Sequence, residues 1–228
     1  MIKNTAAGDQ DHLLQLGLAR LKITLEEESI RNLLAYVGEL RKWNRHINLI
    51  ARKTDAQEII EKHFLDSLTL LFFLRGDYPH REILLDVGTG AGFPGLVLAA
   101  ALPQLQVILV EPRLKRVSFL RHIIRLLTLE NVEVIGDRLE AVSAWHEREI
   151  TWVTSRAVAD PVDFLSMVKP LLDRRASVLL MLSSTQKNRL AGNDFSDKMI
   201  VEECRDFILP FTQTRRTVCK VIKNTQRA

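Results

Sequence analysis

The chain has 228 residues, of which 46% are hydrophobic and 26% are charged, and its formal net charge at pH 7 is +4. This composition excludes a disordered or collagen-like chain, and the length suits one sizeable domain with its own core. The sequence has no apolar run long enough to cross a membrane and no signal-peptide core at its start, so we expect a cytoplasmic protein without a membrane partner. The basic charge mildly favours a polyanionic partner.

The N-terminal third of the sequence has the apolar spacing of helices. Two capping-box patterns mark helix starts, Thr24 with Glu27 and Asp55 with Glu58. Apolar residues recur three and four positions apart after each of them. We therefore expect a helical region over residues 1–80, packed on a second part over residues 81–228.

From residue 82 onward, short apolar runs alternate with helical patterns. Five of these runs predict strands, over 83–87, 106–110, 132–135, 152–155 and 177–182. The tail, over 201–222, has room for two more strands joined near Pro210. Alternating strands and helices imply an α/β fold with a parallel sheet, whose ligand site lies at the carboxyl ends of the strands.

The first predicted strand runs into a glycine-rich turn, Leu85-Asp86-Val87-Gly88-Thr89-Gly90-Ala91-Gly92-Phe93-Pro94-Gly95. Glycines such as Gly88 and Gly90 let the backbone turn sharply and approach a ligand. The dinucleotide fingerprint fails here, because Phe93 stands where its third glycine is needed. The pattern instead suits a cofactor without a pyrophosphate, S-adenosylmethionine, whose ammonium group would lie near the Asp86 carboxylate. The alternative is a tight turn with no ligand.

Two further candidate residues lie at the ends of predicted strands. Glu111 ends the second strand, 25 residues after Asp86, close to the usual spacing of a carboxylate that binds a pair of ribose hydroxyls. A surface acid is the alternative. Arg156 directly follows the fourth strand, so we expect its side chain to project into the ligand cleft, with a salt bridge to a helix as the alternative.

The helix predicted over 114–127 carries a series of basic residues. No acidic residue lies between Pro112 and Thr128. Lys115, Arg121 and Arg125 should lie roughly opposite the apolar face of this helix, where they would bind the phosphates of a nucleic acid. The alternative is a basic helix face that is merely solvated.

The segment Trp43-Asn44-Arg45-His46-Ile47-Asn48-Leu49 ends an earlier predicted helix. Its chemistry suits stacking on a base and hydrogen bonding to it, with Arg45 and Asn48 as candidate RNA contacts. A helix-end cap with a buried tryptophan is the alternative. For His63 and Asp66, farther along, we favour a structural role that pins the helical region to the sheet over a place in the cleft.

The cysteines give no sign of a metal site. Cys204 and Cys219 have no histidine or further cysteine at metal-ligand spacing. We expect both to be reduced, half-buried thiols, as is usual in a cytosolic protein.

Together these motifs resemble those of the bacterial glucose-inhibited division protein B family, also called ribosomal RNA small-subunit methyltransferase G. The resemblance runs from about Thr24 to Asp160 and includes the glycine-rich turn with its Gly-Phe-Pro-Gly ending. The other motifs that carry it are Trp43-Asn44 with Asn48-Leu49, His63-x-x-Asp66-Ser67-Leu68, Lys115-Arg116-x-x-Phe119-Leu120, Arg138-x-Glu140 and Ser155-Arg156-Ala157.

This resemblance implies a Rossmann-like class I S-adenosylmethionine-dependent methyltransferase fold with a helical N-terminal extension. It implies methyl transfer to N7 of a guanine in the decoding-region loop of 16S rRNA, in the free rRNA or in the small ribosomal subunit. We expect a monomer, and no acid–base residue, because guanine N7 already carries an in-plane lone pair. The implied cofactor contacts are Gly88, Phe93, Leu139, Glu140 and Arg156, to which the sequence adds Asp86, Gly90 and Glu111.

The sequence departs from the family pattern around the fifth predicted strand. The family usually has a lysine and a glycine after that strand, where this chain has Leu182-Ser183-Ser184, and a glycine before it, where this chain has Arg174-Arg175-Ala176. The departure bears on substrate affinity rather than on the cofactor site. Two other functions are alternatives: a nicotinamide-dependent oxidoreductase, which the glycine spacing disfavours, and a non-catalytic RNA-binding ribosome-assembly factor that retains the cofactor fold.

Overall fold

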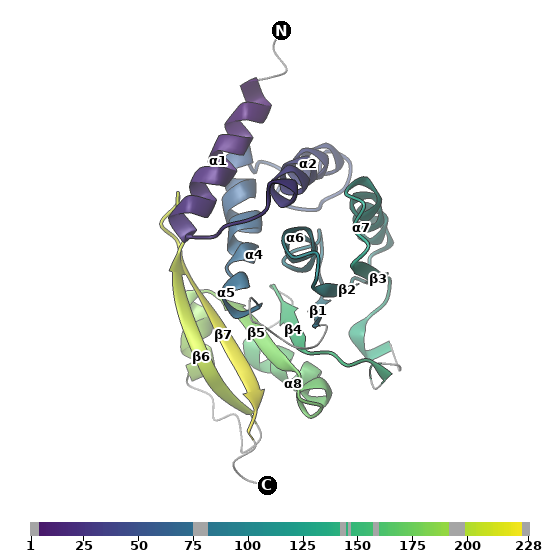
Figure 1. Ribbon diagram of the computed structural model, residues 1–228. Coiled ribbons are helices and arrows are strands. Elements are labelled where there is room, and N and C mark those ends of the chain that lie inside the picture. The colour runs from purple at the N-terminus through teal and green to yellow at the C-terminus, as the bar shows by residue number, and fades with distance from the viewer. Residues whose placement is uncertain are drawn as a thin grey trace.

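A twisted seven-stranded sheet forms the centre of the protein in the computed structural model (Figure 1), which describes residues 5–74, 82–141, 145, 147–156, 160–191 and 199–224. The strands are β1 (Ile83–Val87), β2 (Gln106–Val110), β3 (Val132–Ile135), β4 (Trp152–Ser155), β5 (Ser177–Leu182), β6 (Met199–Ile208) and β7 (Arg215–Lys223). Their order is β3-β2-β1-β4-β5-β7-β6. β1 to β5 run parallel, and β7 pairs antiparallel with β5 and β6. The predicted parallel α/β sheet is confirmed.

Helices cover both faces of this sheet (Figure 1). One face carries α1 (Thr5–Leu21), α2 (Glu27–Trp43), α6 (Gly95–Ala101) and α7 (Leu114–Leu126), and the other carries α8 (Pro161–Leu172). The shorter helices are α3 (Ala56–Ile59), the π-helix η1 (Ile60–Leu65), α4 (Asp66–Leu68), α5 (Leu71–Leu74), the 3-10 helix η2 (Leu139–Ala141) and α9 (Ser184–Ala191). Successive side chains of a strand point to opposite faces, so Leu84 joins the first core and Leu85 the second.

One of the two predicted capping boxes is present. Asp55 caps α3: its Oδ1 accepts a hydrogen bond from Glu58 N at 2.8 Å, and Glu58 Oε2 accepts one from Asp55 N at 3.4 Å. The box predicted at Thr24 is wrong, because α2 begins directly behind Glu26, whose side chain makes no capping hydrogen bond. A run of acids at the start of α2 stabilises the positive end of the helix without a cap.

The N-terminal helices share a core with the helices of the sheet. Leu14, Tyr36 and Phe64 are fully buried in the same cluster as Leu96 of α6 and Phe119 of α7. The boundary expected between residues 80 and 81 lies outside the described residues. In the described part of the chain, no helix is long and apolar enough to cross a membrane.

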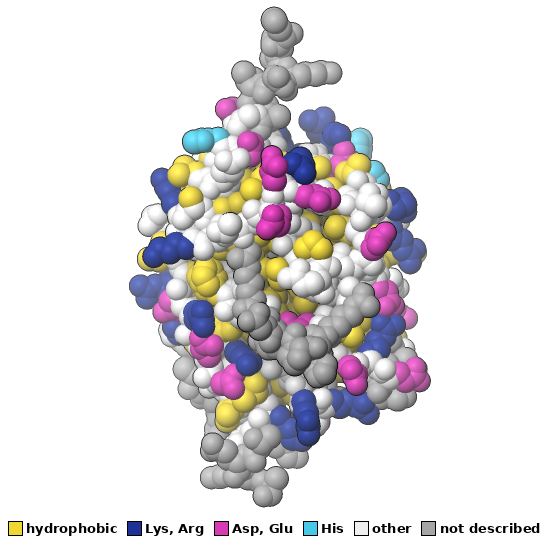
Figure 2. Space-filling model, viewed as in Figure 1, with side chains coloured by type: hydrophobic (Ala, Val, Ile, Leu, Met, Phe, Trp, Pro, Cys, Tyr) yellow, Lys and Arg dark blue, Asp and Glu magenta, His cyan; other side chains and the backbone are white. Residues whose placement is uncertain are grey.

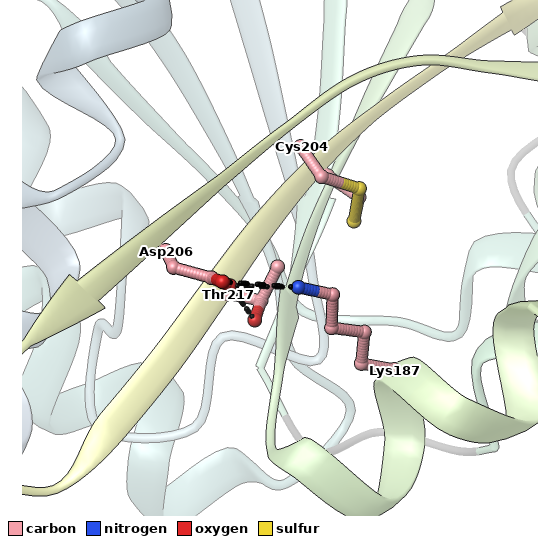
Figure 3. Close-up of a disulfide and its surroundings, with 5 residues drawn as sticks. Lys187, Cys204, Asp206 and Thr217 are labelled. Atoms are coloured by element: carbon pink, nitrogen blue, oxygen red, sulfur yellow. Dashed lines mark hydrogen bonds and ion pairs between the residues drawn. A yellow bond between two sulfur atoms is a disulfide. The ribbon is translucent and has the colours of Figure 1, made fainter.

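The prediction of two reduced thiols is wrong in this structure. Cys204 of β6 and Cys219 of β7 are directly opposite each other across the antiparallel pair and form a disulfide (Figure 3). Close by, Lys187 of α9 pairs with Asp206, and the Thr217 hydroxyl donates to the same carboxylate at 2.6 Å. The spacing of the two cysteines reveals the pair only once the hairpin register is known, and the sequence does not give that register.

Candidate functional site

The glycine-rich turn follows β1 in a backbone conformation that favours glycine. The φ angle is +67° at Gly88, +63° at Gly90 and +93° at Gly92, in the region that side chains disfavour. A Cβ atom at Gly92 would lie 2.8 Å from the Leu96 Cβ and closer still to the Tyr36 hydroxyl. At Gly90 the nearest atom would be Arg116 Nη1, at 3.7 Å. Packing therefore requires Gly92, whereas Gly90 leaves space for a ligand to approach the backbone.

Asp86 stabilises this turn by hydrogen bonds to one carboxylate oxygen, and its other oxygen accepts none in the described structure. Its side chain is fully buried, and its Oδ2 accepts hydrogen bonds from Thr89 Oγ1 at 2.6 Å and Gly95 N at 2.8 Å. Its Oδ1 has no hydrogen-bond partner in the described structure. Burial raises the pKa of this carboxyl to about 6, although the hydrogen bonds from Thr89 and Gly95 oppose the change. A buried carboxylate with a free oxygen suits a cationic ligand group.

We expect Asp86→Asn to stabilise the ligand-free protein at pH 8. The pKa of Asp86 is raised from 3.8 to about 6, so ionisation in the folded state costs stability as the pH rises through that range, and the cost persists above it. A pKa raised by about two corresponds to a loss of at most ~3 kcal/mol of stability in wild type. The variant regains less than this, because the side-chain nitrogen of the new asparagine has no hydrogen-bond partner. Thermal melts should give a higher Tm for the variant than for wild type at pH 8, and equal Tm values for the two proteins near pH 4. A difference that does not change with pH would contradict this account.

Glu111 links the end of β2 to the glycine-rich turn. Its carboxylate is 3% exposed. Oε2 accepts a hydrogen bond from Gly90 N at 3.0 Å, and Oε1 accepts one from Arg113 N at 2.9 Å. Arg116 Nη1 lies 3.6 Å from Oε2. Glu111 is therefore not a surface acid, and each of its oxygens retains a second lone pair that can accept a hydroxyl.

The loop after β3 brings two further predicted residues near these strand ends. Leu139, in η2, is buried in the same core as Val87 and Val110, the last residues of β1 and β2. Its carbonyl accepts a hydrogen bond from Trp145 Nε1 at 2.8 Å. Glu140 is exposed. The side chain of Leu139 is therefore structural, which leaves the backbone of this loop and Glu140 for ligand contacts.

Arg156 projects from the end of β4 toward the π-helix η1. Its Nη1 donates to the Lys62 carbonyl at 2.9 Å, and its Nη2 contacts His63 Nδ1 at 2.8 Å. Burial lowers the pKa of His63 to about 3, so the ring is neutral at neutral pH. Because a guanidinium only donates, Nδ1 accepts and Nε2 carries the proton.

The Phe93 ring packs against both His63 and Arg156. The His63 ring stacks on it at a centroid distance of 4.9 Å, and the Arg156 guanidinium lies 4.8 Å from its centroid. Asp66 also joins the helices to the sheet, since its Oδ2 lies 3.4 Å from Arg216 Nε of β7. These contacts match the structural role favoured for His63 and Asp66. Ala157, the last residue of the Ser155-Arg156-Ala157 motif, lies outside the described residues.

The candidate RNA contacts separate into half-buried and exposed residues. Trp43 packs against Phe119 of α7 at a centroid distance of 5.5 Å, and Asn44 Oδ1 accepts from Leu49 N and Ile50 N at 2.9 and 3.0 Å. The helix-end cap therefore explains both residues. The exposed candidates are Arg45, Asn48, Lys115, Arg121 and Arg125. Dark blue and cyan side chains gather at the upper right in Figure 2, over α2 and α7.

The sequence predicted no role for three polar residues that join the elements around the site. The Tyr36 hydroxyl donates to the Ala91 carbonyl within the glycine-rich turn, and the Tyr36 ring stacks on Phe93. Glu61 of η1 is fully buried and accepts hydrogen bonds from Phe211 N and Thr212 N, at 2.5 and 2.8 Å. Arg116 contacts Glu111. A charged residue within an apolar helix face is the one signal that marks Glu61 in the sequence.

Comparison with known proteins supports the family resemblance. A family model described as rRNA small subunit methyltransferase G matches residues 29–219. The ribosomal RNA small subunit methyltransferase G of Desulfotalea psychrophila is 40% identical over 214 residues, which cover 90% of this chain and 94% of that protein. The protein of the same name from Geobacter sp. strain M21 is 34% identical, covering 93% of this chain and 97% of its own length.

Solved structures agree on the fold. The ribosomal protein L11 methylase of Lactobacillus delbrueckii superposes with a TM-score of 0.52 at 10% identity, covering 72% of this chain and 79% of that one. The human methyltransferase 10 domain containing protein superposes with a TM-score of 0.50 at 13% identity, covering 82% and 96%. The predicted class I methyltransferase fold is confirmed. The glycine-rich turn, the family model and the close relatives together place this chain in the rRNA small subunit methyltransferase G family.

Proposed function

We propose that the protein transfers a methyl group from S-adenosylmethionine to N7 of a guanine in the decoding-region loop of 16S rRNA. The observation that carries the proposal is the glycine-rich turn, which has two buried carboxylates, Asp86 and Glu111, against it and a left-handed backbone at Gly90, where a Cβ atom would meet no atom closer than 3.7 Å. The substrate is the 16S rRNA or the small ribosomal subunit, and the enzyme acts as a cytoplasmic monomer. Residues 1–80 serve as a helical accessory region on the catalytic part, residues 81–228.

The residues of the site fit this cofactor. The free, buried Oδ1 of Asp86 suits an ammonium group, and Glu111 suits a pair of ribose hydroxyls. Gly88 and Gly90 have the left-handed backbone that allows close approach. The full set proposed to hold the cofactor is Asp86, Gly88, Gly90, Phe93, Glu111, Leu139, Glu140 and Arg156.

When bound, S-adenosylmethionine would supply an activated methyl group on its sulfonium, which the in-plane lone pair of guanine N7 could accept directly. No proton is transferred, so the protein needs no general base. The residues of the chain instead align the reactants and exclude water. The π-helix residue His63 holds the Arg156 guanidinium over Phe93, at the side of the site opposite Glu111. The target base has to be unstacked to enter.

Glu111→Ala is expected to weaken S-adenosylmethionine binding by about 1.5–3 kcal/mol, as for lost hydrogen bonds to a charged group. The loss has two sources, the ribose contact and the support that Oε2 gives to Gly90 N. Glu111→Gln is the matched control, because it keeps the side-chain shape and one oxygen acceptor. Titration calorimetry gives the affinities. If the alanine variant binds within a few tenths of a kcal/mol of wild type, Glu111 does not contact the cofactor.

A non-catalytic assembly factor remains the second candidate function, because the basic surface over α2 and α7 would serve RNA binding with or without catalysis. Calorimetry with S-adenosylmethionine and with NAD separates the candidates. We expect binding of the first and none of the second. An assembly factor with a degenerate site would bind neither, and an oxidoreductase would bind NAD. Transfer of a labelled methyl group to small subunits then tests catalysis directly.

A further inference from the structure

A cavity of about 450 Å³ lies between the turn that follows α2 and the first turn of α7. His46, Ile47 and Asn48 line it from one side, and Arg113, Leu114, Lys115 and Arg116 line it from the other. Two segments far apart in the sequence thus form one site. Its volume lies within the range of small-ligand sites.

The chemistry of the lining is that of a nucleotide site. Arg113 and Lys115 are exposed, and neither side chain has a carboxylate partner among the described residues. Leu114 is 76% exposed and is the most exposed large hydrophobic residue in the described chain. Asn48 Oδ1 accepts from Arg52 Nε at 3.1 Å, which leaves the amide nitrogen of Asn48 to donate. Two cations, an apolar wall and an amide donor match a phosphate and a base.

In the absence of a ligand, the basic residues at the start of α7 are repelled by one another and by the positive end of the helix dipole. The first turn of a helix favours acids, yet α7 has none there and carries Lys115 and Arg116 instead. Its N-cap residue, Arg113, makes no capping hydrogen bond through its side chain. Glu111 offsets part of this charge through Arg113 N and Arg116, and an anion in the cavity would reduce the repulsion that remains at Arg113 and Lys115.

The cavity is adjacent to the proposed cofactor site, because Arg116 contacts both. Arg116 lines the cavity and also lies 3.6 Å from Glu111, which accepts the Gly90 hydrogen bond. β2, which precedes Glu111, and β4, which precedes Arg156, flank β1 on opposite sides. The cavity thus borders the Glu111 side, away from Arg156.

From this geometry we infer that the cavity binds one nucleotide of the RNA substrate other than the methylated guanine, with its phosphate on Arg113 and Lys115 and its base against Leu114. The inference rests on the proposed function, since it takes RNA as the substrate. It adds an anchor outside the catalytic centre that fixes the RNA strand while the target base is turned toward the cofactor.

The test compares the double variant Arg113→Ala/Lys115→Ala with wild type. Binding and methylation of small ribosomal subunits are measured across a salt series. We expect affinity to fall at least about tenfold at low salt, and the slope of log affinity against log salt to become less steep by roughly 0.7–0.9, as for one phosphate that is no longer neutralised. KM should rise while kcat and S-adenosylmethionine affinity stay within about twofold, because uniform binding is lost.

Two further variants sharpen the result. Lys169→Ala/Lys223→Ala removes the same charge from α8 and β7, away from the cavity, and should leave RNA affinity near wild type. Leu114→Ala should weaken RNA binding about threefold or more with the salt slope unchanged, because an apolar contact releases no counterions. If the cavity variant behaves like the charge control, or if Leu114→Ala binds like wild type, the nucleotide site is refuted. A failure of the proposed function itself would look different, because the wild-type protein would then methylate no guanine at N7.

Discussion

Replacing Gly92 by alanine should destabilise the protein by roughly 2–5 kcal/mol, through an overpacked core and a left-handed backbone that alanine disfavours. The φ angle at Gly92 is +93°, and its new Cβ atom would meet the Tyr36 hydroxyl and Leu96. Urea unfolding followed by circular dichroism measures the loss. Gly90→Ala is the matched control, because it carries the same sign of φ but would have no atom nearer than 3.7 Å, so it should lose only about 1–2 kcal/mol. Equal losses in the two variants would contradict the packing role of Gly92.

Replacing Gly90 by valine should abolish S-adenosylmethionine binding while the fold survives. The added methyl groups would occupy the space beside Arg116 and Gly88 through which the ligand reaches the backbone. We expect at least about a 100-fold loss of affinity, equivalent to ~2.7 kcal/mol. Calorimetry gives the affinity, and a cooperative thermal melt shows that the variant is folded. Wild-type affinity in a folded Gly90→Val protein would remove this turn from the cofactor site.

The sequence predicted the parallel part of the fold well, because each strand is a short apolar run that ends at a polar or glycine residue. The bounds of β1 to β5 agree with the predicted ranges. The pattern after the first strand also predicts a helix over 93–102, but Phe93 and Pro94 belong to the turn and α6 begins at Gly95. Local patterns do not distinguish a tight turn from the first turn of a helix when both are rich in small residues.

The features that the sequence did not reveal all depend on contacts distant along the chain. The π-helix η1 directs Glu61 to the backbone of Phe211 and Thr212, 150 and 151 residues away. Arg156 reaches His63 across 93 residues. The disulfide depends on the register of β6 and β7. Periodicity reports which face of an element is apolar, but it does not report which partner each buried polar group finds.

The central claim is most directly tested by mapping methylated nucleosides in 16S rRNA from cells with and without the gene for this protein. The rRNA is digested with ribonuclease and the fragments are analysed by mass spectrometry. We predict one 7-methylguanosine, in a decoding-region fragment, that is absent without the gene and is restored by the wild-type protein but not by Gly90→Val. An unchanged methylation pattern in cells lacking the gene would contradict the account.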